Sequence, residues 1–243
     1  MHHVGTCRSS VNLARFLSAQ GILVCRIDLP NLGDSGPRFD QRQMDEETRT
    51  REELGAVIDQ LTSEFGDRGV IIYGLCSGSQ NGFKLAVQDS RVIGLFGVDH
   101  FGFRNWSYKL VHYARQCFRL EPWLNQLKRL SQHKKNEDAQ GNAIDLGGAD
   151  FVWQYPTQKS VEAGYRVLVE RGVRMQYVYT GDWSGEYNHR RQFFLMHSSV
   201  DFKGQVHVDY CPAMSHILAE PSSQEFIQSQ VLAFVIALRN EER

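Results

Sequence analysis

The stretch from residue 69 to residue 88 restricts the possible fold more than any other part of this sequence. A short apolar run, 69–73, ends in the segment GLCSG at 74–78, and a helical pattern with Phe83 and Val87 on one face follows. β-Branched and aromatic residues in the run favour a buried strand, while the glycines indicate a sharp turn. The stretch therefore predicts a strand, a tight turn and a helix in immediate succession.

The central residue of this turn is Cys76, and the pattern Gly-x-Cys-x-Gly is typical of a nucleophile elbow. Glycines are expected at 74 and 78 because side chains there would collide with neighbouring backbone. At a helix N-terminus, the unpaired amides favour thiolate over thiol. A buried structural cysteine is the alternative interpretation. Ser77 is a competing nucleophile, but its backbone amide is expected to point into an oxyanion hole.

The length of the chain suits a single domain, and its charge balance gives no sign of a highly charged partner. The 243 residues suit one α/β domain, 1–243, and the net charge is −1. We therefore expect neither nucleic acid nor a membrane surface as a partner. The five scattered cysteines form no Cys-x-x-Cys pair, which argues against a disulfide framework and a zinc site and suits a cytoplasmic location. Oligomeric state is not predicted.

Short β-branched runs alternate with helical patterns, as in a mostly parallel sheet with helices on both faces. The predicted helices flank the sheet, and the charged stretch inside the second helix is interpreted as a solvated face. The predicted strands are 22–28, 69–73, 92–98, 174–180 and 205–210, and the main predicted helices are 9–20, 45–66 and 222–239. The predicted fold class is α/β.

One segment, 101–160, interrupts this alternation. It carries aromatic and basic residues on helical patterns, followed by a polar loop. An insertion at this place predicts a lid or cap over a site, and its aromatic residues suggest an apolar or extended acyl chain. An additional helical pair that only packs is the alternative.

Two motifs give the chain a resemblance to the α/β-hydrolase superfamily. The segment 13–36 resembles the family's helix, strand and D-L-x-x-x-G-D-S loop, and GLCSGS at 74–79 resembles its elbow. Within the superfamily the chain resembles the serine-aminopeptidase-like and exosortase-associated hydrolases that carry a GLCSG-type elbow. The resemblance covers most of the chain and implies an α/β-hydrolase fold with the order nucleophile, acid, histidine.

This resemblance implies which residues accompany Cys76. His216 lies after the last predicted strand, where the family carries its general base. The acid has two candidates: Asp182, in the loop after strand 174–180, is favoured over Asp99, at the end of the strand that follows the elbow. Six other histidines are expected on the surface or in packing roles: His100, His112, His133, His189, His197 and His207.

The resemblance also implies an oxyanion hole with two backbone donors. Ser77 is the first, and Val4 or Gly5, with Thr6 as a further candidate, is the second. The sequence starts at what resembles the loop itself, so the first strands of the family are expected to be absent. A late assigned start, a minimal domain and an impaired site all remain open. Asp34 and Ser35 are interpreted as scaffolding of their loop.

The predicted activity is acyl hydrolysis of an ester or thioester through a covalent acyl-enzyme on Cys76. The substrate is expected to be a small acyl compound, with an acyl carrier as a further candidate partner, and no cofactor or metal is predicted. An acyltransferase using the same site is one alternative, and a non-catalytic accessory protein with a hydrolase fold is another.

Overall fold

The computed structural model describes residues 3–30, 33–36, 46–117 and 155–241, and its centre is a parallel sheet. Four strands lie in the order in which they occur in the sequence, β1-β2-β3-β4, and every neighbouring pair is parallel. All four strands therefore end at the same edge of the sheet. The predicted α/β class is confirmed.

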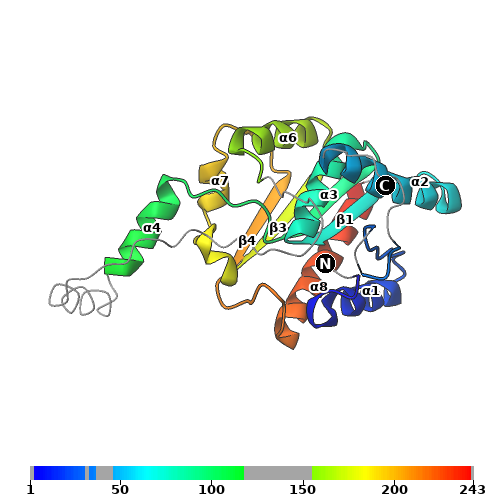
Figure 1. Ribbon diagram of the computed structural model, residues 1–243, viewed down its shortest axis with the longest axis horizontal. Coiled ribbons are helices and arrows are strands. Elements are labelled where there is room, and N and C mark those ends of the chain that lie inside the picture. The colour runs from blue at the N-terminus through cyan, green and yellow to red at the C-terminus, as the bar shows by residue number, and fades with distance from the viewer. Residues whose placement is uncertain (1–2, 31–32, 37–45, 118–154, 242–243) are drawn as a thin grey trace.

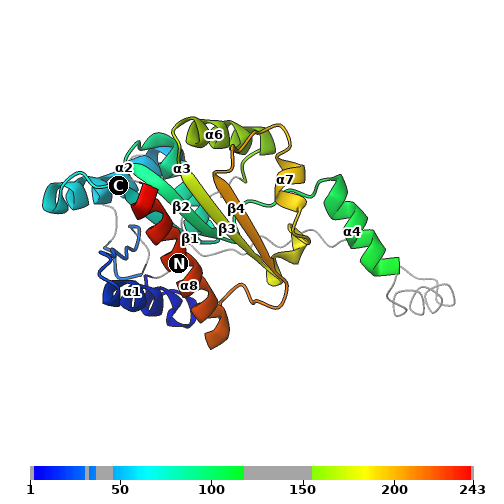
Figure 2. The ribbon, with the colours of Figure 1, turned by 180° about the vertical axis from the view of Figure 1, so that it is seen from behind.

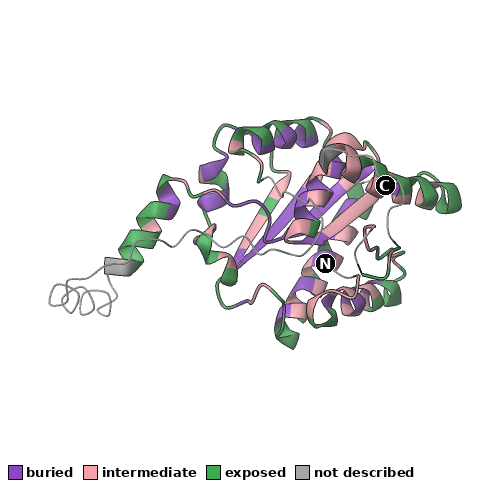
Figure 3. Ribbon diagram, in the orientation of Figure 1, coloured by how far each residue is buried: buried purple, intermediate pink, exposed green. Residues whose placement is uncertain are grey.

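The strand bounds follow the apolar runs of the sequence closely. The strands β2 (Val92–Val98) and β3 (Arg174–Thr180) coincide with their predicted ranges. β1 (Val70–Leu75) and β4 (Val206–Cys211) start and end one or two residues later than predicted. β2 and β3 are almost entirely buried, as their continuous apolar sequences require in the middle of a parallel sheet (Figure 3).

Helices cover both faces of this sheet, as predicted (Figures 1 and 2). One apolar cluster joins one face of the sheet to α3 (Ser77–Gln88) and α6 (Gln158–Glu170). A second cluster joins the other face to α1 (Ser9–Ala19) and α8 (Pro221–Glu241).

Two further helices add to the first cluster. α2 (Glu46–Phe65) packs against α3, and the short α7 (Gln192–Met196) adds Phe193 to the first cluster. In the described part of the chain, no helix is long and apolar enough to cross a membrane.

The predicted strand at 22–28 is wrong. These residues belong to no strand or helix, and Leu23 and Ile27 remain 65% and 39% exposed. Ile22 and Val24 only pack at the margin of the α1–α8 cluster. β-Branched composition alone does not make a strand, because a strand also needs a neighbour for its backbone hydrogen bonds. In the described sheet β1 pairs only with β2, so this neighbour is missing.

The insertion predicted at 101–160 lies largely at 118–154, outside the described residues. Its described beginning contains α4 (Trp106–Cys117), which projects away from the sheet in Figure 1. Its last residues open α6, which the sequence reading did not identify as a helix. The signal was present: Val161, Tyr165 and Leu168 repeat at helical spacing, and Thr157 caps the first turn by accepting from the Ser160 amide.

Two buried histidines make the core sensitive to acid. His100 and His197 are both fully buried. Burial lowers the pKa of His100, and it lowers the pKa of His197 to about 4 although the nearby Glu162 carboxylate opposes that shift. Both rings are therefore neutral in the folded protein near pH 7 and must leave the core, or disrupt it, to take up a proton.

We expect folding stability to fall as the pH drops below the ordinary histidine value of about 6.5, because the unfolded chain then binds more protons than the folded one. For His197 alone the loss between pH 7 and pH 5 is about 2 kcal/mol. Chemical denaturation across this range measures it. The exposed His207 supplies the control: H207Q should keep the wild-type slope, whereas H197Q should flatten it. An unchanged slope in H197Q would contradict the assignment.

Candidate active site

The four strand ends bring together the residues that the sequence singled out. Cys76 follows β1, Asp99 follows β2, Asp182 lies two residues beyond β3, and His216 lies five residues beyond β4. Because parallel strands all end at one edge of the sheet, residues 140 positions apart in the chain become neighbours.

Cys76 occupies the strained turn that the sequence predicted. Its backbone has φ 53° and ψ −119°, a conformation that costs a non-glycine residue of order 1–3 kcal/mol. The strain is held from both sides: the Cys76 amide donates to the Val98 carbonyl of β2 (2.8 Å), and the Cys76 carbonyl accepts from the Gln80 amide in α3 (3.1 Å). The half-buried thiol thus stands between the end of β1 and the start of α3.

The two glycines of the elbow differ in their roles. A Cβ on Gly74 would lie well under 3.0 Å from backbone atoms of Gly78 and Ser79, so only glycine fits there. A Cβ on Gly78 would meet no atom within 4 Å, and Gly78 does not have a positive φ. The steric expectation is confirmed for Gly74 and wrong for Gly78, because Gly78 faces outward from the first turn of α3.

Asp99 is the carboxylate that contacts the His216 imidazole. Its Oδ2 lies 2.7 Å from His216 Nδ1, and its side chain is fully buried. Thr180 completes the carboxylate shell, since its amide donates to Asp99 Oδ1 and its hydroxyl to Asp99 Oδ2, both at 2.7 Å. A positive φ of 50° at Asp99 aims the side chain across the strand ends. The buried charge is therefore paired and hydrogen-bonded.

Asp182, which the sequence reading favoured as the orienting acid, contacts the backbone of His216 instead. Its Oδ2 accepts from the His216 amide at 2.9 Å, while the imidazole turns to Asp99. Asp182 opens a short turn, Asp182–Gly185, immediately after β3, so its exposed side chain reaches the loop of His216 but not its ring.

Trp183, in the same turn, was not predicted to belong to the site. Its ring lies parallel to the His216 imidazole, with centroids 5.4 Å apart and an interplanar angle of 14°. Stacking on one side and the Asp99 hydrogen bond on the other fix the plane of the imidazole. The sequence signal was weak, because an aromatic residue beside a candidate acid is common in loops.

The pKa of the His216 imidazole is raised by its neighbours. Hydrogen bonds with Asp99 and with Cys76 raise the pKa of His216 to about 10, against the opposing effect of burial. The ring is therefore protonated at neutral pH, with a carboxylate at Nδ1 and the Cys76 sulfur within hydrogen-bonding reach. Cys76, His216 and Asp99 form a continuous chain from sulfur to buried carboxylate.

The residues predicted to form the oxyanion hole lie in two different segments of the structure. Ser77 is the first residue of α3, where backbone amides have no acceptor within the helix, and it adjoins Cys76. Gly5 has φ 72°, and its carbonyl accepts from the Arg8 amide at 3.2 Å.

The loop that carries Val4 and Gly5 is tied to the rest of the molecule. His3 Nδ1 lies 2.6 Å from Asp28 Oδ2, and Gln224 of α8 donates to the Cys7 carbonyl at 3.2 Å. Asp34 and Ser35 act on Asp28 as predicted for scaffolding residues: the Asp34 amide donates to Asp28 Oδ2, and the Ser35 hydroxyl donates to the Asp28 carbonyl.

The other described histidines lie outside this chain of groups. His100 bonds the Ser79 hydroxyl in the core (2.7 Å), His189 bonds Ser107, and His207 is exposed. His133 lies outside the described residues. Tyr155 is nearer to the site: its hydroxyl is held by the backbone of Gly102, and burial raises its pKa to about 12, with the charge of Cys76 adding to this shift.

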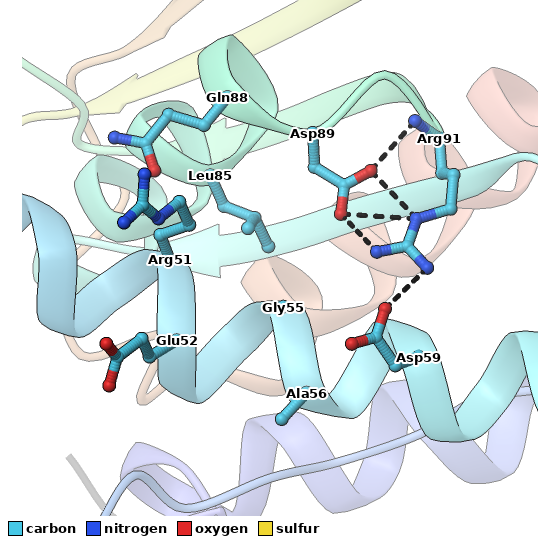
Figure 4. Close-up of a pocket in the computed structure, with 9 residues that line it drawn as sticks. All are labelled: Arg51, Glu52, Gly55, Ala56, Asp59, Leu85, Gln88, Asp89 and Arg91. Atoms are coloured by element: carbon cyan, nitrogen blue, oxygen red, sulfur yellow. Dashed lines mark hydrogen bonds and ion pairs between the residues drawn. The ribbon is translucent and has the colours of Figure 1, made fainter.

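A separate groove of about 380 Å³ lies between α2 and the distal end of α3 (Figure 4). Its lining includes Leu85, Asp89 and Arg91, which lie at or beyond the end of α3 opposite to Ser77. Arg91 is paired with Asp89 (2.6 Å) and Asp59 (2.7 Å), so its charge is already neutralised. This groove therefore lies at the end of α3 opposite to Cys76.

Among the comparisons with known proteins, only the comparison of structures gives a match. No family model matches the sequence, and no curated protein matches it. Among solved structures, the chain is similar to alpha/beta hydrolase domain-containing protein 10 from mouse, with a TM-score of 0.53 and 13% sequence identity over 98% of this chain and 86% of that one. The chain has the α/β-hydrolase fold. Within this fold, Cys76 lies at a strand-to-helix turn and His216 follows the last strand, in agreement with the expected order of motifs.

Proposed function

We propose that this α/β-hydrolase-fold chain is an acyl hydrolase that forms a thioester on Cys76. The observation that carries the proposal is the 2.7 Å hydrogen bond between the His216 imidazole and the buried Asp99 carboxylate, together with the raised pKa of His216, to which Cys76 contributes. A nucleophile, a proton carrier and a group that orients it are the three parts that covalent acyl transfer needs. They lie on three different loops at one edge of the sheet.

In the first half of the reaction the Cys76 thiolate attacks the carbonyl carbon of an ester or thioester. A sulfur–carbon bond forms, and the carbonyl electron pair moves to oxygen, where the Ser77 amide is the nearest first-turn donor. When the tetrahedral intermediate collapses, the bond to the leaving alcohol or thiol breaks. The His216 imidazolium gives its Nε2 proton to that group, a role that suits a ring whose pKa is about 10.

In the second half the neutral His216 takes a proton from water, and the hydroxide attacks the acyl carbon. The sulfur–carbon bond then breaks, the carboxylic acid leaves and the thiolate and imidazolium are restored. Asp99 keeps its charge throughout, and its two contacts with Thr180 hold it in place for both halves.

The GLCSG elbow further supports a place among the serine-aminopeptidase-like and exosortase-associated hydrolases, and we include this assignment in the proposal. The aromatic residues of 101–117 favour an apolar acyl group delivered as a small molecule or on an acyl carrier. The free thiols of Cys7, Cys25, Cys76 and Cys211 favour a cytoplasmic location.

Intact-protein mass spectrometry after brief exposure to short and medium acyl thioesters tests the proposal. We expect the wild type to gain one acyl group, C76A to gain none, and H216A to gain it more slowly by about 10²-fold or more. Peptide mapping should place the group on Cys76. An adduct that persists undiminished in C76A would overturn the assignment of the nucleophile.

The fate of the adduct separates the alternative functions. Release as free acid supports hydrolysis, whereas release only after an amine or alcohol is added supports an acyltransferase. No adduct with any substrate, together with no labelling of Cys76 by iodoacetamide at neutral pH, would favour a non-catalytic protein. C211A is a matched control, because Cys211 is another half-buried free thiol with no histidine bonded to it in the described structure.

A further inference from the structure

We propose that His3, Asp28 and Asp34 form a binding site for a divalent first-row transition-metal ion. The three side chains offer one imidazole nitrogen and two carboxylate oxygens, and these atoms all lie within 4.8 Å of one another. This site is separate from the chain of groups at Cys76 and does not depend on the proposed acyl chemistry. The sequence predicts no metal because His3 lies far from the other two ligands along the chain, and the three are brought together only by folding.

The distances between the ligand atoms suit one ion. Around a metal with bonds of about 2.0–2.2 Å, neighbouring ligand atoms lie about 3–3.5 Å apart. His3 Nδ1 lies 2.6 Å from Asp28 Oδ2 and 3.8 Å from Asp34 Oδ2, values on either side of that spacing. A small movement of the exposed Asp34 side chain would bring all three onto the ion, which would replace the proton now shared by His3 and Asp28.

An independent observation points to a missing ligand at Asp28. Its side chain is only 3% exposed, yet its Oδ1 is buried without any hydrogen-bond partner in the described structure. An unsatisfied buried carboxylate oxygen is costly, and such groups normally pair or coordinate a metal. Asp28 and both partner side chains line the same surface pocket of about 370 Å³, so an ion has access to the site.

Hydrogen bonds hold the Asp28 loop in place, and the charged groups of the pocket favour a divalent ion. The Asp34 amide and the Ser35 hydroxyl fix Asp28 and its loop (2.9 and 2.7 Å). Arg26 also lines the pocket and donates to the His3 carbonyl at 3.1 Å. Two carboxylates and one guanidinium leave one net negative charge, which a divalent ion converts to one positive charge.

The donor set indicates the class of ion. Mg²⁺ and Ca²⁺ prefer oxygen ligands alone, whereas an imidazole with carboxylates suits Mn²⁺, Fe²⁺, Co²⁺ or Zn²⁺. With three protein ligands, water would complete the coordination. A bound ion would clamp the loop of His3 to the loop of residues 28–35, and so stabilise two segments that are not part of the sheet.

Titration of the metal-free protein with Mn²⁺, followed by electron paramagnetic resonance, tests this site. Mn²⁺ is the probe because thiolates, which this chain also carries, bind it weakly in comparison with Zn²⁺ or Co²⁺. We expect one Mn²⁺ per chain, displaced by Zn²⁺. The variants H3Q and D34N should each weaken binding at least ~10-fold. Asp34 is 76% exposed, so D34N removes a ligand without disturbing the fold.

The exposed pair of His207 and Asp209 provides the matched control, since it has the same residue types but no third ligand. H207Q should bind Mn²⁺ as the wild type does. Three results would overturn the proposal. They are the absence of Mn²⁺ binding to the wild type at 1 mM, binding by H3Q and D34N that is as tight as that of the wild type, and a weakening of Mn²⁺ binding in H207Q that is as large as in those two variants. Acylation of Cys76 is measured separately, so failure of either proposal leaves the other intact.

Discussion

Replacement of Asp99 by asparagine is expected to lower kcat/KM for acyl transfer by about 10²–10⁴, the usual contribution of general acid–base catalysis. The reason is that Asp99 holds the plane and the proton of the His216 ring at 2.7 Å. Because its hydrogen bond is the largest cause of the raised pKa of His216, D99N should also move that pKa from about 10 toward 6.5. Steady-state kinetics across pH and NMR titration of His216 measure both effects.

Asp182 is the matched control for this experiment. D182N keeps an acceptor for the His216 amide and leaves the imidazole untouched, so the loss should stay within about tenfold. Thermal unfolding of both variants separates a loss of stability from a loss of chemistry. Equal losses in D99N and D182N, or a His216 pKa that does not move in D99N, would contradict the assignment of Asp99.

The second large effect is expected from G74A, which should destabilise the fold by about 3 kcal/mol or more. The added methyl group would meet the backbone of Gly78 and Ser79, and backbone atoms cannot turn away as a side chain can. G78A is the control, since a methyl group there meets open space and alanine favours a helix by up to ~1 kcal/mol over glycine. Urea denaturation of the two variants measures the difference.

A G74A variant as stable as the wild type would mean that the turn at Cys76 is looser than described. Activity gives a second readout: G78A should keep the rate of acylation of Cys76 within a few fold, because it leaves the backbone of the turn unchanged. Loss of acylation in G78A without loss of stability would show that an approach to the sulfur passes over Gly78.

The sequence predicted most of the sheet because buried parallel strands are continuous apolar runs. Residues 92–98 and 174–180 are largely apolar runs of this kind, and each lies between two parallel neighbours in the sheet. Residues 22–28 have the same composition but lack a paired neighbour in the described sheet, and no local pattern reveals that. A strand is a property of two segments, whereas composition reports on one.

The sequence also predicted part of the candidate site. Cys76 and His216 follow from their places relative to strands, and the elbow adds a local signature. The choice between Asp99 and Asp182 was not predictable, because both follow strands that end at the same edge. The difference lies in side-chain direction: a positive φ at Asp99 turns it inward, and the turn at Asp182 faces outward.

The distance along the chain between the partners of the site also has a consequence for biosynthesis. Cys76 and Asp99 belong to one compact unit that a ribosome completes early, whereas His216 emerges 117 residues after Asp99. Since domains fold as their segments emerge, the nascent polypeptide carries the Cys76 sulfur without the His216 imidazole until the segment after β4 has been made. Synthesis itself thus delays the onset of reactivity until the sheet that confines it is complete.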